Sequence, residues 1–173
     1  SSLPERPQTL VAIAPHQTVG FTQTDRPTFF IYLSNNAAKS VELSLFNEQK
    51  QGLYQTILPI QQQSGLVALS LPKDAPKLIK RQNYYWTIAV VCNDNDRTED
   101  RIMSGWIQYR DFSENLSNLL PLERVALYAK QGFWYDAILE WSALHQKQPQ
   151  HPAIRKAWTD LIQAIDLSAS VTP

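Results

Sequence analysis

Residues 84–92 read Tyr-Tyr-Trp-Thr-Ile-Ala-Val-Val-Cys, and this stretch decides the fold. Successive side chains of a β-strand point to opposite faces, so Tyr84, Trp86 and Ile88 share one face. The other face, which begins with Tyr85, is also fairly apolar. A short run that is apolar on both faces is typical of a buried strand. The sequence therefore predicts a central strand over residues 84–92.

Similar apolar runs surround this strand. Between residues 10 and 110 they alternate with turn residues at the spacing of a sandwich or barrel. The expected strands are residues 10–14, 28–33, 41–46, 54–60, 66–71, 84–92 and 103–109. Tyr84 stands near the start of the penultimate strand, where Ig-like and fibronectin-like sandwiches often have a tyrosine that hydrogen-bonds back to the preceding connection. By analogy, we predict an Ig/fibronectin-like antiparallel β-sandwich over residues 10–111, after a leader of residues 1–9.

The apolar period becomes helical after Arg110. Pro121 suits the first turn of a helix, and Gly132 suits the position just after its end. Trp141 and Trp158 belong to two further stripes at helical spacing. These signals predict a helical hairpin plus a capping helix over residues 112–168, with a tail of residues 169–173. The predicted fold class is therefore mixed: a β-sandwich followed by a small helical domain.

The helical part resembles a tetratricopeptide repeat. Small Ala137 would let two helices approach each other, and Pro149 would end the second helix. The residues at the spacing of the repeat are Tyr128, Gly132, Trp134, Ala137, Trp141, Leu144 and Pro149. A single repeat cannot bury its apolar stripe alone. We therefore expect it to dock on the sandwich or on a partner, and rigid docking on the sandwich is our prediction.

Composition and charge argue against several classes of function. The 173 residues include 16 basic and 16 acidic residues, so the chain lacks the positive field on which non-specific nucleic-acid binding depends. The sequence has no run of about 18 apolar residues, the length that indicates a membrane-spanning helix. A single cysteine excludes a disulfide within the chain.

The most polar segment, residues 93–100, is the strongest candidate for a metal site. Ca²⁺ prefers clustered oxygen ligands. The candidate ligands are Asp94, Asp96, Glu99 and Asp100. The segment lacks the glycine and the final glutamate of an EF-hand loop, so a solvated hairpin is the favoured interpretation. We therefore predict no metal ion and no other cofactor.

The sequence contains no recognisable catalytic set. His145 and His151 are separated by a predicted turn and have no neighbouring cysteine, which does not fit a zinc site. Cys92 has no evident cationic neighbour in the sequence, so we interpret it as a buried structural thiol. The chain is therefore predicted not to be an enzyme. A hydrolase with an unfamiliar site is the least favoured alternative.

Several motifs in a fixed order carry a family resemblance. They are Pro27-Thr28-Phe29, Ser70-Leu71-Pro72, Tyr84-Tyr85-Trp86 with Cys92, Asp96-Arg97-Thr98, Gly105-Trp106-Ile107-Gln108 and the segment from Glu123 to Ala137. With them the chain, from about residue 10 to about residue 167, resembles the cyanobacterial family known as domain of unknown function 928. The resemblance implies a cyanobacterial source and an exported precursor whose signal has been removed, hence a periplasmic or secreted location. It implies no activity.

Aromatic side chains of the helical part are the best candidates for contacts with a ligand. Trp141 and Trp158 fit core stripes, whereas Trp134 and Tyr135, at the junction with the sandwich, are the predicted interaction residues. Tyr135 lies off the main stripe of its helix, so we expect it to be accessible. The leading hypothesis is a non-enzymatic protein-interaction or structural module of the cell envelope, with a protein partner of unknown identity. The alternative is a carbohydrate-binding module, assisted by Ca²⁺ at the acidic segment. The oligomeric state stays open.

Overall fold

The fold is described from a computed structural model that places residues 11–12, 18–33, 39–60, 65–91, 95 and 101–170. In these described residues, eight strands come first and three helices follow, which confirms the predicted mixed class. The elements are β1 (Val11–Ala12), β2 (Val19–Thr22), β3 (Thr28–Leu33), β4 (Ser40–Phe46), β5 (Gly52–Pro59), β6 (Gly65–Ser70), β7 (Asn83–Val91), β8 (Arg101–Tyr109), α1 (Pro121–Lys130), α2 (Trp134–Lys147) and α3 (Pro152–Ser170).

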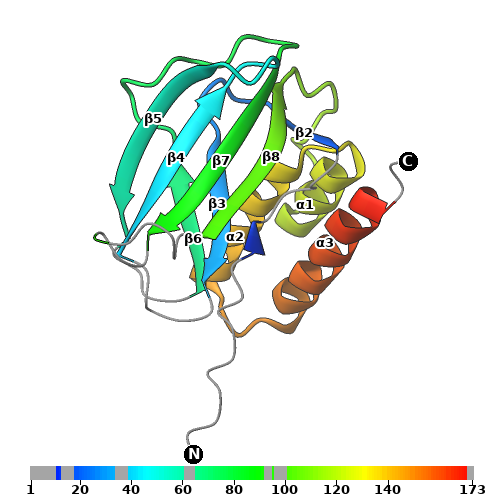
Figure 1. Cartoon of the computed structure of the whole chain (residues 1–173). Coiled ribbons are helices and arrows are strands. Elements are labelled where there is room, and N and C mark those ends of the chain that lie inside the picture. Colours follow the sequence, from blue (N-terminus) through cyan, green and yellow to red (C-terminus); the bar gives the residue numbers. More distant parts are fainter. Residues whose placement is uncertain are drawn as a thin grey trace, which may run out of the picture.

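The strands form two sheets (Figure 1). The smaller sheet has the order β1-β3-β6, and the larger has the order β2-β8-β7-β4-β5. Strand β2 runs parallel to β8, and the other neighbouring strands are antiparallel. Strand β7 lies in the middle of the larger sheet, so the predicted central strand is confirmed. Strand β2 is the one element of the larger sheet that the sequence patterns did not predict.

The inner faces of the two sheets enclose the first hydrophobic core. Alternate residues of β7, such as Trp86 and Ile88, meet the inward residues of β3, such as Phe29. A Cβ atom on Gly105 would lie 2.6 Å from the indole of Trp86, so only glycine fits there. The hydroxyl of Tyr84 accepts a hydrogen bond of 2.9 Å from the backbone N–H of Ile79, in the preceding connection. This is the tyrosine contact that the sequence predicted.

The three helices enclose a second hydrophobic core. Their apolar stripes meet there, including Val125 of α1, Ile138 of α2 and Leu161 of α3. Gly132 stands between α1 and α2 with a φ of +82°, a conformation that residues with a Cβ rarely adopt. Helix α3 continues to Ser170, so it extends slightly beyond the predicted end of the helical unit at residue 168.

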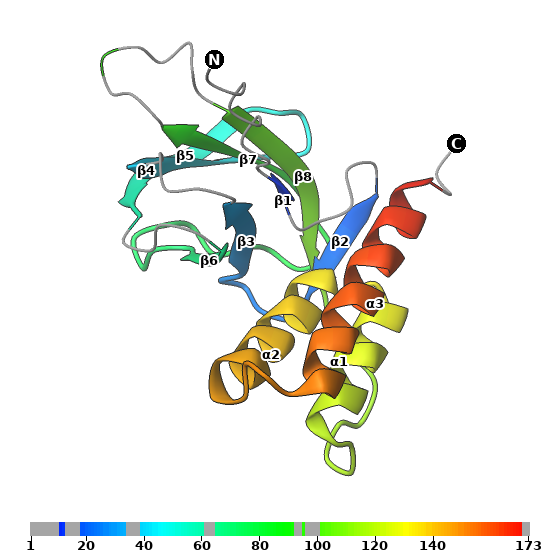
Figure 2. The same ribbon diagram turned by 90° about the horizontal axis from the view of Figure 1, so that it is seen from below.

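The two halves of the chain exchange side chains where they meet. Tyr135 of α2 belongs to the core between the sheets, and Phe30 of β3 belongs to the helical core. The Tyr135 hydroxyl accepts a hydrogen bond of 2.8 Å from Nε1 of Trp86 and donates one of 3.1 Å to the carbonyl of Trp106. Seen from below, the helices lie beside the smaller sheet and β2 (Figure 2). The helices thus dock on the sheets, as predicted, and the rigidity of this docking stays a prediction.

Candidate functional site

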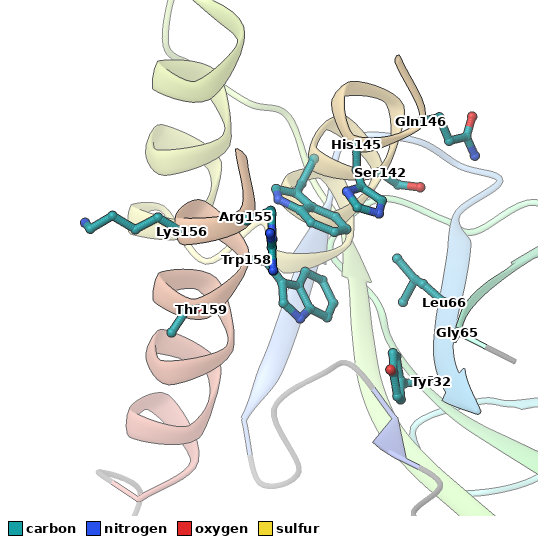
Figure 3. Close-up of a pocket in the computed structure, with 11 residues that line it drawn as sticks. Tyr32, Gly65, Leu66, Ser142, His145, Gln146, Arg155, Lys156, Trp158 and Thr159 are labelled. Atoms are coloured by element: carbon teal, nitrogen blue, oxygen red, sulfur yellow. The ribbon is translucent and has the colours of Figure 1, made fainter. Parts of the chain in front are cut away.

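A cleft lies at the junction of the two halves. One wall is the outer face of the smaller sheet, with Tyr32 of β3 and Leu66 of β6. The opposite wall is formed by α2 and the first turns of α3 (Figure 3). We call this space the junction cleft. Its volume of about 810 Å³ lies within the range of ligand sites in proteins.

Stacked aromatic rings form the helical wall of the junction cleft. The indoles of Trp141 and Trp158 are 4.4 Å apart, and the imidazole of His145 stacks on Trp141 at 4.7 Å with an angle of 12°. Nε1 of Trp141 donates a hydrogen bond of 2.8 Å to the carbonyl of Ile154, which fixes the indole between α2 and α3. Trp158 is only half-buried, so part of its ring is available to a ligand.

The sheet wall offers the cleft one further ring. Tyr32 points out of the smaller sheet and is 42% exposed. Figure 3 places Tyr32 and Leu66 on the side of the cleft opposite Trp158. A planar or apolar group that enters the cleft would therefore meet aromatic surface on both sides, which is the kind of contact that dominates many binding energies.

The charge of the cleft is positive. Arg155 and Lys156 line it, and no lining residue in the described part of the chain is acidic. Lys156 points away on the far side of α3 and pairs with Asp160 at 3.2 Å (Figure 3). Within the described residues, Arg155 has no carboxylate partner. A guanidinium without a partner beside aromatic rings favours a ligand that carries a carboxylate or another anion.

One buried atom in the cleft wall has no polar partner. Nδ1 of His145 is covered and makes no hydrogen bond to any described residue. Buried polar atoms are normally paired, and an unpaired one costs about 1–3 kcal/mol. Stacking on Trp141, rather than a hydrogen bond, therefore holds the imidazole in place.

A second, smaller groove lies between α1 and α3. Its volume is about 360 Å³, and its walls are mainly small apolar side chains such as Ala126, Ala129 and Ala157. The groove is less polar than the junction cleft and holds no unpaired charge, since its Lys156 and Asp160 pair with each other. Apart from this ion pair, its lining side chains offer no hydrogen-bond donor or acceptor that would orient a polar ligand.

Asp136 is a buried carboxylate close to the junction. It accepts a hydrogen bond of 3.2 Å from the backbone N–H of Gln23, and burial raises its pKa to about 7. The side-chain amide of Gln23 donates a hydrogen bond of 2.7 Å from its Nε2 to the hydroxyl of Tyr128. A raised pKa can mark a functional group, but Asp136 lines neither concavity. These bonds connect the turn after β2 with α1 and α2, which is a structural role.

The predicted interaction residues lie inside the protein. Trp134 is 8% exposed and Tyr135 is 3% exposed. The prediction that Tyr135 is accessible is wrong, because its ring fills space in the core between the sheets and its hydroxyl is paired there. Trp141 is a core residue, as its helical stripe indicated. The accessible aromatic residues of the junction are instead Trp158 and Tyr32.

Other predicted candidates lie outside the described residues. They are Cys92 and the acidic ligand candidates Asp94, Asp96, Glu99 and Asp100. Within the described residues, no group of three or more histidine, cysteine, aspartate and glutamate side chains is arranged to hold a metal ion. The Ca²⁺ hypothesis therefore stays a prediction.

Sequence reasoning did not single out Arg155 and Tyr32, which line the junction cleft. Trp141 and His145 are four residues apart, and Arg155 and Trp158 are three apart, which are the spacings of neighbours on one helix face. Those spacings could have identified each of these two pairs as neighbouring side chains on one helix face. The approach of Tyr32 to these helices has no signal in the sequence, because it depends on how the helices dock.

The fold and the cleft together define a two-sheet domain with docked helices and an aromatic, positively charged site at the junction. The family model described as Domain of Unknown Function (DUF928) matches residues 1–173, and the chain belongs to this family. No curated protein matches the chain by sequence. In the described ranges, no helix has both the length and the apolar character needed to cross a membrane.

Proposed function

We propose that the chain is a non-enzymatic binding module that holds an acidic segment of a partner protein in the junction cleft. The observation that carries this proposal is that one cleft combines accessible aromatic rings with the guanidinium of Arg155, which has no carboxylate partner among the described residues. An aromatic side chain of the partner would stack on Trp158, and a neighbouring carboxylate would pair with Arg155. Neither of these two contacts identifies the partner protein.

The proposal extends to the finer class of both halves. The strand orders β1-β3-β6 and β2-β8-β7-β4-β5 and the contact between Tyr84 and Ile79 support an Ig-like sandwich. The hairpin of α1 and α2, with fully buried Ala137 in the helical core and Gly132 at the turn, supports a tetratricopeptide-like unit. Both scaffolds serve binding functions in many proteins, which is an argument by analogy.

A location in the periplasm or outside the cell is part of the same proposal. It is supported by the resemblance of the sequence motifs alone. Fractionation of the source cells, with detection of the native protein in periplasm and cytoplasm, would test the location. Recovery of the protein only with cytoplasmic markers would contradict it.

A titration with defined peptides tests the binding proposal. The probes are 12-residue peptides that contain phenylalanine with glutamate, with glutamine or with lysine, so the tryptophan emission of the protein reports binding. We expect saturable binding of the glutamate peptide, weaker binding of the glutamine peptide and none of the lysine peptide. Equal binding of all three peptides, or none of any, would contradict an acidic ligand.

Charge reversal in the cleft gives the matched control. Arg155→Glu should weaken binding of the glutamate peptide at least tenfold, about 1.4 kcal/mol, because attraction becomes repulsion. Lys130→Glu changes the charge equally at an exposed position of α1, away from the cleft, and should leave the affinity unchanged. An equal effect of both substitutions would mean that net charge, and not the cleft, controls binding.

A carbohydrate-binding module is the second candidate function. Trp158 and Tyr32 offer ring surface on which sugars stack, and Ser142, Gln146 and Thr159 add hydrogen-bonding groups to the same cleft. A glycan array probed with and without Ca²⁺ tests this candidate. Binding that Trp158→Ala abolishes would support it over the peptide, and an empty array would remove it.

A further inference from the structure

The outer face of the larger sheet carries a row of aromatic side chains. Phe46 of β4 is opposite Tyr85 of β7, and Tyr85 is opposite Trp106 of β8. Their ring centroids are 5.9 Å and 5.1 Å apart, and the ammonium of Lys50 lies 4.5 Å from the centroid of Tyr85. These rings point away from the core, because the residues beside them in the strands point inward. We call Phe46, Tyr85 and Trp106 the aromatic row.

A second row on the same face is aliphatic. Ala89 of β7 is opposite Ile102 of β8 and also opposite Glu42 of β4, which in turn is opposite Ile57 of β5. Ile102 is 70% exposed and Ile57 is 59% exposed, which is unusual for isoleucine. Glu42 is the one charged residue among them. We call this set the aliphatic row.

The residues between the two rows are uncharged. Ser44, Thr87 and Ser104 are paired side by side across β4, β7 and β8. Figure 1 looks onto this face, and none of the described helices or strands covers it. Ser44 and Ala89 are only 6% and 8% exposed, whereas the three rings are half-buried and the two isoleucines are exposed. A sheet face with this much accessible apolar surface and so little charge is typical of an interaction site.

We propose that this face binds the same face of a second copy of the chain. We call Ser44, Thr87 and Ser104 the middle row. A two-fold axis that lies in the plane of the interface, along the middle row, would rotate the second copy by 180° relative to the first. The aromatic row of each copy would then lie on the aliphatic row of the other, and the middle rows would meet. Lys50 of one copy would approach Glu42 of the second copy, so the two opposite charges would also match. The face is therefore complementary to the same face of a second copy, both in the order of its rows and in its charges.

The size of the face sets the strength of this dimer. Four strands about 4.8 Å apart and five residues of about 3.4 Å each span roughly 320 Å² in projection. Two copies would bury about 650 Å² plus the relief of the side chains, which is less than the roughly 1,200 Å² of a stable complex. The dimer is therefore weak and reversible, with a dissociation constant in the micromolar range.

Sedimentation equilibrium of the whole chain between about 5 and 500 µM tests the dimer. The average mass should rise toward that of a dimer across this range. Ile102→Lys should weaken the dimer at least tenfold, because it removes buried apolar surface and forces an ammonium group to lose its water in the interface. Ile79→Lys is the matched control, since Ile79 is 58% exposed but lies in the connection before β7. A monomer at every concentration, or equal weakening by both substitutions, overturns the proposal.

Charge exchange tests the two-fold arrangement. Glu42→Lys alone should weaken the dimer several-fold, because it brings two positive charges together at each end of the interface. Adding Lys50→Glu in the same chain restores opposite charges across the interface and should recover most of the affinity. A double variant that dimerises no better than Glu42→Lys overturns this arrangement.

Discussion

At the residue scale, Tyr135 joins the two halves of the molecule. Its ring packs at 82° to that of Phe29, and a Cβ atom on Gly20 would lie 2.7 Å from it. Its hydroxyl binds Trp86 and Trp106, so one side chain of α2 is paired within the larger sheet. Sequence reasoning placed this residue at the junction, but on the surface. Its position off the main stripe of α2 indicated exposure, whereas its ring belongs to the first hydrophobic core, between the sheets.

Removal of this hydroxyl should destabilise the protein. Tyr135→Phe leaves the indole N–H of Trp86 and the carbonyl of Trp106 without their partner, at a cost of about 1–3 kcal/mol. Urea unfolding followed by circular dichroism measures this loss. The control Tyr32→Phe removes a hydroxyl from an exposed ring and should change the free energy of unfolding by less than about 0.5 kcal/mol. Similar values for both variants would show that the Tyr135 hydroxyl is not needed for docking.

Asp136 should make stability depend on pH. Its pKa is raised to about 7, mainly by burial, while the unfolded carboxyl has its ordinary value of about 3.9. Between these values the folded state binds the proton more tightly, so the free energy of unfolding falls as pH rises through this window. The fall between pH 5 and pH 8 should be about 2–3 kcal/mol.

Asp136→Asn keeps an oxygen acceptor but removes the titration. Urea unfolding of the variant should therefore show a flatter pH profile than the original chain over the same window, with the largest difference in slope between pH 5 and pH 7. Parallel profiles would mean that another group causes the dependence.

At the scale of elements, the turn between α1 and α2 requires Gly132. Its φ of +82° disfavours any side chain, and a Cβ atom would lie 3.3 Å from the ring of Phe21. Gly132→Ala should therefore lower the free energy of unfolding by about 1 kcal/mol or more. Gly52→Ala is the control, because a Cβ atom there meets nothing within 4 Å. Thermal unfolding compares the two, and an equal shift of the melting temperature would contradict a specific need for glycine at the turn.

The strands that were predicted are short apolar runs bounded by turn residues. Strand β3 has the predicted bounds, β4 begins one residue before its predicted start, and β6 and β7 differ from the predicted bounds by one residue at each end. Strand β2 was missed because its four residues, Val19–Thr22, include Gly20 and offer too short a pattern to distinguish a strand from a loop. Its parallel pairing with β8 joins distant segments of the chain and has no local signal.

At the scale of the whole molecule, docking of the helices creates the junction cleft. Its walls come from β3 and β6 on one side and from α2 and α3 on the other, which are far apart in the sequence. The sequence indicated that a lone helical repeat needs cover, and this predicted the docking. It did not indicate which faces meet. Trp158 and Tyr32 therefore could not be recognised as opposite walls of one site.

The cleft and the outer face of the larger sheet are separate surfaces. The cleft lies against the outer face of the smaller sheet, whereas the aromatic and aliphatic rows lie on the larger sheet. Binding in the cleft and pairing of two copies therefore need not compete. Arg155→Glu should leave dimerisation unchanged, just as Ile102→Lys should leave peptide binding unchanged.

An NMR titration of the ¹⁵N-labelled chain with the glutamate peptide tests the cleft most directly. The indole N–H signal of Trp158 and the amide signals of Leu66 and Arg155 should shift and saturate together. The indole signal of Trp86, which is bonded to Tyr135 in the core, should stay in place. Shifts confined to Trp106 on the outer face of the larger sheet, or no shifts at all, would contradict a binding site in the junction cleft.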